Sequence, residues 1–335
     1  MNNPNDSYYK WFKAKRGMFI HFGLYSLLGG EYLGKRCNSY CEWIQSFARI
    51  PNKILEQIAG GFAPCFDADS IVAFAKTIGC EYIVFTAKHH DGFALFNSFD
   101  AFNVCNTPYK KDIIGELARA CQKYGVRLGL YYSQFIDWHC PDGGGYLEEK
   151  VGCAGSSWDN DWDYPDQSKK NYNICFEQKI MPQIKEIMSN YGQISLAWFD
   201  MPLQMTANQS KIIYQTVKKL QPNCLVNSRL GGGSYDYVSL GDNEIPQDLN
   251  VNSYDDNAIN GLKPSKLGLY ECACTLNNTW GYSKFDNNYR TSQQVATLSQ
   301  KLACLGVNYL INVSPNQDGA IPKEQKEILL KAFCK

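Results

Sequence analysis

The stretch IIGELARACQKYGVRLGLYY, residues 113–132, contains the local pattern that decides the fold. Its first part, Ile113–Lys123, places apolar residues at helical spacing, and Gly125 follows where helices often end in a left-handed residue. Its last part, Arg127–Tyr132, is a short apolar run with the length of a buried strand. An amphipathic helix followed at once by such a strand is typical of a parallel sheet covered by helices.

The same alternation runs along the whole chain. Seven further apolar runs are candidate strands: Met18–Leu24, Tyr82–Thr86, Ile194–Phe199, Cys224–Asn227, Tyr237–Leu240, Leu267–Cys272 and Asn308–Asn312. Five further amphipathic stretches are candidate helices: Ser70–Ile78, Phe176–Asn190, Ser210–Leu220, Ser292–Cys304 and Lys323–Phe333. Eight strands alternating with helices predict a closed (β/α)8-like TIM barrel, which we expect to be one domain over residues 1–335.

The composition excludes some classes of partner. Lys plus Arg and Asp plus Glu both number 33, so no net field draws the protein to nucleic acid or to an anionic membrane. No apolar run is long enough to span a bilayer, and the N-terminal residues are polar. The 14 cysteines are scattered within apolar patterns, which is typical of reduced thiols. We therefore expect a soluble cytoplasmic protein.

Cysteine and histidine spacing gives little support for a metal site. Cys37 and Cys41, and likewise Cys272 and Cys274, are spaced like metal ligands but lack a convincing second pair. We expect neither a metal nor a cofactor.

Polar side chains gather where the predicted strands end. His21, His89, His90 and His139 all lie at such positions, which in a βα barrel are the positions of the catalytic face. Single histidines are often structural, and a metal-dependent hydrolase is the rival reading of this group. The neighbours His89 and His90 would point to opposite faces of a continuing strand, which disfavours metal ligation by both.

Three carboxylates follow predicted strands. Asp200 comes directly after the apolar residues 194–199, and Glu244 and Glu271 lie after or at the end of later strands. Asp200 could instead cap the next helix, but three residues intervene before a helical pattern begins. Two carboxylates about 5–5.5 Å apart are the minimum machinery of a retaining glycoside hydrolase. Arg229 and Trp280 add an orienting guanidinium and an apolar wall.

Five motifs in order resemble the α-L-fucosidases of glycoside hydrolase family 29. The motifs are FIHFGLYS (19–26), CEW (41–43), KHHDGF (88–93), WFD (198–200) and WGY (280–282). The closing NYLINVSP (308–315) is also similar to the end of that family's catalytic domain. The resemblance implies a retaining exo-α-L-fucosidase in which Asp200 attacks the anomeric carbon and forms a fucosyl-enzyme.

The resemblance also implies a set of sugar-binding residues and a substrate class. The residues that would hold the fucose hydroxyls are His21, Glu42, Trp43, His89, His90, Tyr132 and Arg229. Trp280 would contact the C5 methyl group of the sugar. The partner would be a fucosylated oligosaccharide or glycoconjugate.

The acid/base and the oligomeric state are expectations drawn from departures from the family pattern. The loop that carries the acid/base in the family is shortened here, and we assign Glu244, with Glu271 as runner-up and Asp242 third. Family members commonly have a C-terminal β-sandwich that can contribute to the site, and we expect none in this chain. A neighbouring copy would fill that place, so we expect a homo-oligomer.

Two alternatives share the same barrel. One is a fucose-binding protein without catalysis, and the other is a transfucosidase in which an acceptor sugar competes with water. Linkage preference would depend on loops such as Cys140–Lys169 and Asn250–Lys263, which carry no interpretable motif.

Overall fold

Eight parallel strands form the centre of the molecule in the computed structural model, which describes residues 9–144, 153, 156–249 and 264–334. They are β1 (Arg16–Ile20), β4 (Tyr82–Lys88), β5 (Arg127–Ser133), β6 (Leu196–Asp200), β7 (Leu225–Val226), β8 (Val238–Ser239), β9 (Tyr270–Cys274) and β10 (Asn308–Val313). Their order is β7-β6-β5-β4-β1-β10-β9-β8. A parallel bridge between Asn227 and Tyr237 joins the ends of this order and closes the sheet. The predicted TIM-like barrel is confirmed.

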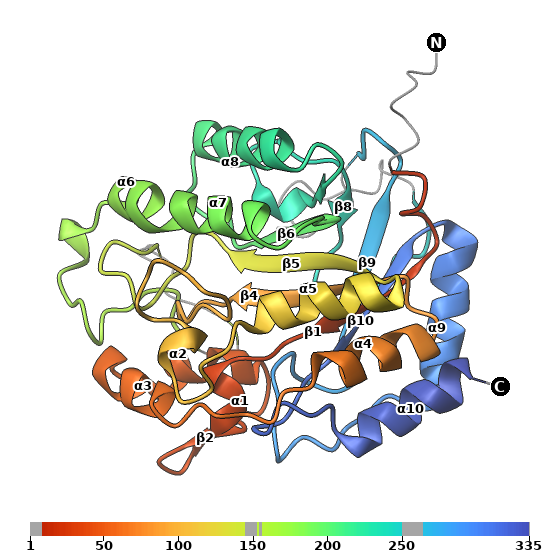
Figure 1. Cartoon of the computed structure of the whole chain (residues 1–335), viewed down its shortest axis with the longest axis horizontal. Helices are drawn as coiled ribbons and strands as arrows, with labels where there is room; N and C mark the ends of the chain where they lie inside the picture. Colours follow the sequence, from red (N-terminus) through yellow and green to blue (C-terminus); the bar gives the residue numbers. More distant parts are fainter. Residues whose placement is uncertain (1–8, 145–152, 154–155, 250–263, 335) are drawn as a thin grey trace.

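Helices cover the outside of the barrel. The long ones are α4 (Ala68–Thr77), α5 (Ile113–Tyr124), α7 (Met181–Ser189), α8 (Ala207–Leu220), α9 (Ser292–Leu305) and α10 (Lys323–Phe333). Figure 1 shows α7 and α8 on one side of the sheet, α4, α5 and α10 on another, and α9 at the end away from the arrowheads of β4 and β5. None of the helices described is long and apolar enough to cross a membrane.

Local sequence explains where these helices begin and end. Asp112 accepts a hydrogen bond from the backbone of Gly115 and so caps α5, which ends at Gly125 with φ of 64°. Thr206 and Thr291 each form a reciprocal capping box with the glutamine three residues later, at the starts of α8 and α9. These caps satisfy backbone donors that the first turn of a helix leaves free.

Several boundaries differ from the expectations. The predicted strand Met18–Leu24 ends at Ile20, and the short helix α1 (Leu24–Leu28) begins where that strand was expected to finish. The predicted helix Phe176–Asn190 is preceded by α6 (Tyr172–Cys175) and starts with a π-helical segment, η6 (Phe176–Ile180). Two more short helices, α2 (Ile44–Ala48) and α3 (Asn52–Ala59), and a hairpin of β2 (Glu31–Tyr32) and β3 (Lys35–Arg36) were not predicted.

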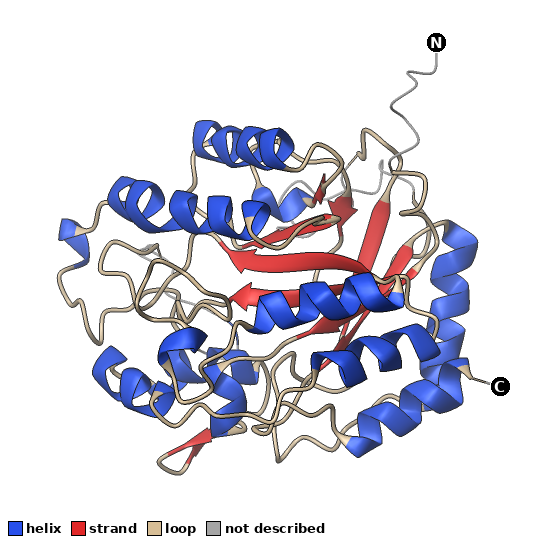
Figure 2. Ribbon diagram, viewed as in Figure 1, coloured by secondary structure: helices blue, strands red, loops and turns tan. Residues whose placement is uncertain are grey.

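The barrel interior has its own core of large side chains. Phe19, Tyr82, Tyr131, Trp198 and Tyr237 are almost completely buried and belong to one cluster inside the sheet. A second and larger cluster packs the outer face of the strands against the helices. Figure 2 shows β4 and β5 as arrows that point toward the same end of the barrel. The functional site lies at that end, above the inner cluster.

Candidate active site

A pocket opens at the C-terminal ends of the barrel strands. Eight residues that the sequence indicated line it: His21, Glu42, Trp43, His89, His90, Asp200, Arg229 and Trp280. Most come directly after strands, as the barrel architecture requires. Glu42 and Trp43 come from a short 3₁₀ turn, η2 (Cys41–Trp43), which lies beside the segment that follows β9.

Asp200 ends β6 and is held on three sides. Its Oδ2 accepts a hydrogen bond from the Tyr131 hydroxyl at 3.0 Å, and its Oδ1 accepts one from Nη1 of Arg229 at 3.0 Å. Its backbone N–H donates to Oε1 of Gln134 at 2.7 Å. Burial raises the pKa of Asp200, while Arg229 and Tyr131 act in the opposite direction. The carboxylate is thus fixed in position, and its two donors offset part of the effect of burial on its charge.

Arg229 joins two carboxylates in the pocket. It lies in the 3₁₀ turn η7 (Ser228–Leu230) after β7, and its guanidinium lies 5.0 Å from the Trp198 ring. Nη1 binds Asp200 and Nη2 binds Asp242. Burial alone would lower the pKa of Arg229, but the two carboxylates raise it above its ordinary value. The guanidinium therefore stays charged and draws Asp242 toward Asp200.

The loop after β8 presents Asp242, not Glu244, to the pocket. Glu244 is exposed, and its Oε2 accepts a hydrogen bond from the Gly241 backbone at 2.8 Å, so its side chain turns back onto its own loop. Asn243 has φ of 58° and its Oδ1 accepts from the Thr275 backbone at 2.9 Å. Asn243 has a left-handed backbone and is anchored to the segment after β9. The side chains on either side of it therefore differ in direction: Asp242 faces the pocket and Glu244 does not.

Glu271 lies inside the barrel and does not line the pocket. It is fully buried and accepts hydrogen bonds from Tyr82 at 2.7 Å, from Trp198 at 2.8 Å and from Tyr237 at 3.4 Å. Burial raises its pKa to about 7. These contacts occupy the carboxyl group within the inner core, so the structure places neither Glu244 nor Glu271 where an acid/base would reach a sugar in this pocket.

Tyr131, and not Tyr132, reaches the pocket from β5. Successive residues of a strand point to opposite faces. Tyr131 pairs in register with Trp198 and faces inward, whereas Tyr132 faces the helices and donates to Oε1 of Gln183 at 2.7 Å. The expectation that Tyr132 reaches a sugar is therefore corrected. Trp198 and Asp200 are two residues apart and therefore face the same side of β6, which is the inside of the barrel. Tyr131 is paired with Trp198, so this alternation could have identified Tyr131 as the inward tyrosine.

Three histidine rings and an aromatic wall form the side of the pocket. His89 stacks on Tyr131 with centroids 5.3 Å apart, and His90 lies 4.1 Å from His89. His21 packs against Trp280 with centroids 5.3 Å apart. Burial lowers the pKa of His21 to about 4 and that of His89 and His90 well below the ordinary value. The three rings are neutral at physiological pH.

His139 lies elsewhere, although it also follows a strand. Its Nε2 lies 2.9 Å from Oε1 of Glu56, and its ring stacks on Phe102 with centroids 4.0 Å apart. The expected clustering of four histidines thus holds for three. Among the described residues, no group of three or more His, Cys, Asp or Glu side chains is arranged to hold a metal ion.

Glu42 is fixed to the segment that carries Trp280. Its Oε2 accepts hydrogen bonds from the Gly281 backbone at 2.7 Å and from the Thr279 hydroxyl at 3.3 Å. Burial raises its pKa to about 8. Asp242, which the sequence analysis ranked third as acid/base, also lines the pocket. The other lining residues were not predicted as ligands: Phe19, Tyr40, Tyr131, Cys153, Trp198 and Met201. Polar groups converging over an apolar floor suit a small polyhydroxylated ligand with one apolar edge.

The chain matches one protein family over nearly its whole length. The family model for α-L-fucosidases matches residues 2–332. The α-L-fucosidase of Dictyostelium discoideum is 25% identical over 350 residues, which cover 95% of this chain and 67% of the relative. The plasma α-L-fucosidase of Homo sapiens is 26% identical, with 93% and 64% covered. The chain therefore spans about two thirds of the length of these curated relatives.

Solved structures are more similar. The α-L-fucosidase AlfC from Lactobacillus casei, in complex with its α-L-fucose product, is 53% identical with a TM-score of 0.91, and the match covers 99% of this chain and 97% of AlfC. AlfC in complex with Fucα(1,6)GlcNAc is 52% identical with a TM-score of 0.88, covering 96% of each chain. An α-L-fucosidase from Vibrio sp. strain EJY3 is 34% identical with a TM-score of 0.81, covering 95% of this chain and 53% of the other.

Proposed function

Because the chain belongs to the α-L-fucosidase family and is a glycoside hydrolase of that class, we propose that it is a retaining, exo-acting α-L-fucosidase. The observation that carries the proposal is the arrangement of Asp200, Arg229 and Asp242 in one pocket. A carboxylate held by two donors, with a second carboxylate beside it, is the arrangement that double displacement at an anomeric carbon needs. The catalytic unit is the single barrel.

In the first step, an oxygen of Asp200 attacks the anomeric carbon of a terminal fucose. The bond from that carbon to the glycosidic oxygen breaks as the new carbon–oxygen bond forms, and the acid gives its proton to the departing oxygen. In the second step, the acid/base residue removes a proton from water. The water oxygen attacks the anomeric carbon while the bond from that carbon to Asp200 breaks, and α-L-fucose is released. Tyr131 and Arg229 orient the nucleophile and stabilise its charge in both the free enzyme and the product state.

Asp242 is the residue that we assign as acid/base, in place of Glu244 and Glu271. It lines the pocket, its side chain is 28% exposed, and it is joined to Asp200 through one guanidinium. Retention requires the two carboxyl groups to face one another across the sugar, and one guanidinium contacts both of them here. Because Asp242 is bonded to Nη2 of Arg229, proton donation requires the carboxyl group to leave this contact when the glycosidic oxygen arrives.

The pocket accounts for fucose as the sugar. His21, Glu42, His89 and His90 surround it with groups that can accept or donate hydrogen bonds to the ring hydroxyls. Trp280 is 5% exposed and offers an apolar contact to the C5 methyl group. The floor of buried Phe19 and Trp198 closes the pocket, so a single terminal residue enters and the aglycone stays outside.

The similarity to AlfC indicates the first substrates to try. AlfC has been solved with 4-nitrophenyl α-L-fucopyranoside and with Fucα(1,6)GlcNAc, and its relatedness at 52% identity favours the same two compounds here. Transfer to acceptor sugars is a second candidate outcome of the same fucosyl-enzyme, since a variant of AlfC is described as a fucosyltransferase mutant. Association of copies remains a prediction, as does the role of residues 250–263 in linkage preference, which lie outside the described residues.

The deciding experiment is hydrolysis of 4-nitrophenyl α-L-fucoside followed by proton NMR. Wild-type protein should release nitrophenol and give α-L-fucose as the first-formed anomer, which then mutarotates. Asp200→Asn should release nitrophenol at least about a thousandfold more slowly, because it removes the nucleophile. First appearance of the β anomer would overturn retention. Fucose binding without turnover in the wild type would support the binding protein instead.

A further inference from the structure

The three histidines of the pocket differ in what their ring nitrogens contact. A neutral imidazole has one nitrogen that donates a hydrogen bond and one that accepts, and the contact on one nitrogen decides the role of the other. The groups that contact the ring nitrogens therefore determine which nitrogen donates and which accepts. The partners of His21 and His90 leave one consistent assignment for each ring.

The partner of His21 is Asn312, on β10. The Asn312 amide nitrogen lies 2.8 Å from the carbonyl oxygen of Trp280, which can only accept a hydrogen bond. The orientation of the amide is therefore set, and its Oδ1 faces Nδ1 of His21 at 2.7 Å. An amide oxygen can only accept, so Nδ1 carries the proton of the ring. Nε2 of His21 is left with a free lone pair at the pocket.

The partner of His90 is Ser133, at the end of β5. The Ser133 Oγ lies 2.8 Å from the carbonyl oxygen of Ile136 and 2.7 Å from Nδ1 of His90. The hydroxyl has one proton, and the carbonyl has none to give, so the serine donates to Ile136. The contact with His90 is then a hydrogen bond only if Nδ1 donates. Nε2 of His90 is left with a free lone pair.

The other two histidines provide contrasts. Nδ1 of His89 is buried and has no hydrogen-bond partner among the described residues, so nothing there sets its tautomer. Nε2 of His139 faces the carboxylate of Glu56, which accepts, so that nitrogen carries a proton. The chain has only these four histidines. His21 and His90 are thus held with the proton on Nδ1, and His139 has a proton on Nε2. Within the part of the chain that the structure describes, no contact of Nδ1 determines the tautomer of His89.

We propose that Asn312 and Ser133 are positioning residues that hold His21 and His90 in the Nδ1–H tautomer, so that each ring offers a bare Nε2 as hydrogen-bond acceptor to the substrate. The proposal rests on the fucosidase function for the identity of that substrate. Two sugar hydroxyls are then required to donate to these acceptors, while His89 adapts to a third. A fluorine atom in place of either of the two hydroxyls cannot donate and leaves the buried lone pair unpaired.

The tautomers can be measured in the free protein. In protein labelled with ¹⁵N at histidine, at pH 7, long-range proton–nitrogen correlation should show protonated Nδ1 and unprotonated Nε2 for His21 and His90. His139 should show a protonated Nε2 and serves as the internal reference. Assignment uses His21→Gln and His90→Gln. A protonated Nε2 on His21 or His90 would overturn the proposal, whatever the protein turns over.

A matched pair of serine variants tests the positioning role. Ser133→Ala removes the acceptor of His90, and its spectrum should show the His90 proton move to Nε2, with KM for the aryl fucoside raised by about tenfold. Ser210→Ala removes another fully buried hydroxyl that donates to a carbonyl, at Leu230, but touches no histidine. It should leave the histidine spectrum and KM unchanged. An unchanged His90 tautomer in Ser133→Ala would show that Ser133 does not set it.

Binding of fluorinated sugars separates this proposal from the proposed function. Fucose and its 3-deoxy-3-fluoro and 4-deoxy-4-fluoro analogues are titrated calorimetrically into the wild type. Fucose should bind, and at least one analogue should bind about tenfold or more weakly, because two of the sugar hydroxyls must donate. Equal binding of all three, with the tautomers as assigned, would overturn the recognition role alone. Absence of fucose binding would overturn the proposed function.

Discussion

Tyr131 donates a hydrogen bond from its hydroxyl to Oδ2 of Asp200 over a distance of 3.0 Å. The same ring stacks between His89 and Trp198, so both its position and its orientation are fixed by neighbours. A hydrogen bond to a charged carboxylate contributes more than one between neutral groups, and the contribution changes as the nucleophile loses its charge to the anomeric carbon. We therefore expect Tyr131 to contribute to the chemical step of the proposed mechanism.

Replacing the two adjacent tyrosines should therefore affect different properties, catalysis in one case and stability in the other. Tyr131→Phe should lower kcat for the aryl fucoside by about 10- to 100-fold, since it removes one charged hydrogen bond from the nucleophile. Tyr132→Phe removes a hydroxyl that bonds Gln183 behind the sheet, and should keep kcat near wild type while lowering the unfolding midpoint. Steady-state kinetics with thermal melts would check both. A loss of kcat in Tyr132→Phe alone would contradict the placement.

Asp242 is expected to behave as the acid/base and Glu244 as a bystander. Asp242→Asn should slow hydrolysis of Fucα(1,6)GlcNAc far more than that of 4-nitrophenyl fucoside, because only the poor leaving group needs a proton. Glu244→Gln changes an exposed side chain that bonds its own loop, and both substrates should react as in the wild type. The ratio of the two kcat/KM values measures the difference. A selective loss in Glu244→Gln instead would restore that residue to the role.

External azide should distinguish the two catalytic carboxylates by product stereochemistry. In Asp242→Ala, azide attacks the fucosyl-enzyme on Asp200 and should give α-fucosyl azide. In Asp200→Gly, azide replaces the nucleophile and attacks the substrate directly, which should give the β azide. Azide should not rescue Glu271→Ala, since Glu271 lies in the inner core with three hydrogen bonds. Rescue of Glu271→Ala with an α azide would contradict the assignment of Asp242.

The stability of the fold should depend on pH through Glu271. Burial raises its pKa from 4.5 to about 7, so the folded protein keeps a proton that the unfolded chain releases near pH 4.5. The stabilising effect of that proton is fully present below pH 4.5 and is lost as the pH rises through 7, a change of up to about 3 kcal/mol. Glu271→Gln should therefore lose less stability than the wild type between pH 5 and pH 8.

Denaturant unfolding of wild type and Glu271→Gln at both pH values checks this difference. Burial also raises the pKa of Glu42 to about 8 and of Asp91 to about 7, and these groups act in the same direction. They are present in both proteins, so their effects cancel in the comparison. Parallel pH dependence of the two proteins would show that Glu271 is not protonated in the fold.

The sequence predicted all eight barrel strands, because each is a buried apolar run between helical patterns. It missed α1 to α3, which are short, and α1 begins at the end of the apolar run that starts at Met18. Local pattern has little power over helices of this length. Tertiary packing at the mouth of the barrel determines these helices instead.

In the site, too, the sequence predicted some residues correctly and others not. Asp200 and the pocket histidines follow strands directly, so their placement is a matter of topology. The choice between Tyr131 and Tyr132 depends on which face of β5 lies inside, and adjacent identical residues give no contrast in polarity. The choice between Asp242 and Glu244 depends on the left-handed backbone of Asn243 and its anchor at Thr275. A loop conformation fixed by a distant segment leaves no signal in the loop itself.

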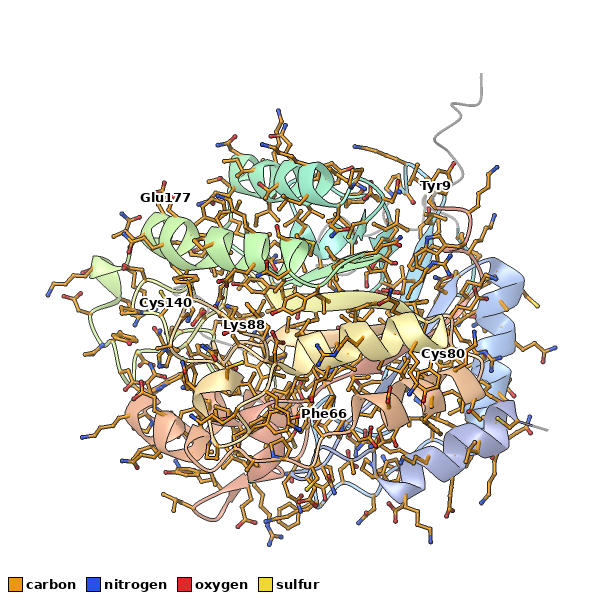
Figure 3. The ribbon with its side chains drawn as sticks, viewed as in Figure 1. Tyr9, Phe66, Cys80, Lys88, Cys140 and Glu177 are labelled. Atoms are coloured by element: carbon orange, nitrogen blue, oxygen red, sulfur yellow. The ribbon has the colours of Figure 1, made fainter. Side chains whose placement is uncertain are left out.

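A buried ion pair behind the pocket should be essential for stability. Lys88, which is labelled in Figure 3, ends β4. Its Nζ lies 2.8 Å from Oδ2 of Asp137, and both side chains are fully buried. Lys179 lies 3.1 Å from the same carboxylate. Burial by itself would raise the pKa of Asp137, but the two lysines lower it below the ordinary value. Asp137 is therefore charged in the fold, and its contact with Lys88 ties the segment 88–90 to the one that follows β5.

Lys88→Met should lower the free energy of unfolding by about 3–5 kcal/mol, since it leaves Asp137 buried with one of its two cations missing. Adding Asp137→Leu to that variant should recover part of the loss, because no unpaired carboxylate then remains. The matched control is Lys123→Met, which breaks an ion pair of the same length, 2.8 Å, between half-exposed side chains and should not shift the unfolding midpoint measurably. Denaturant titration of the four proteins measures their free energies of unfolding. Equal losses of unfolding free energy in Lys88→Met and Lys123→Met would contradict the prediction that the buried pair matters more, because burial is the physical difference between the two pairs.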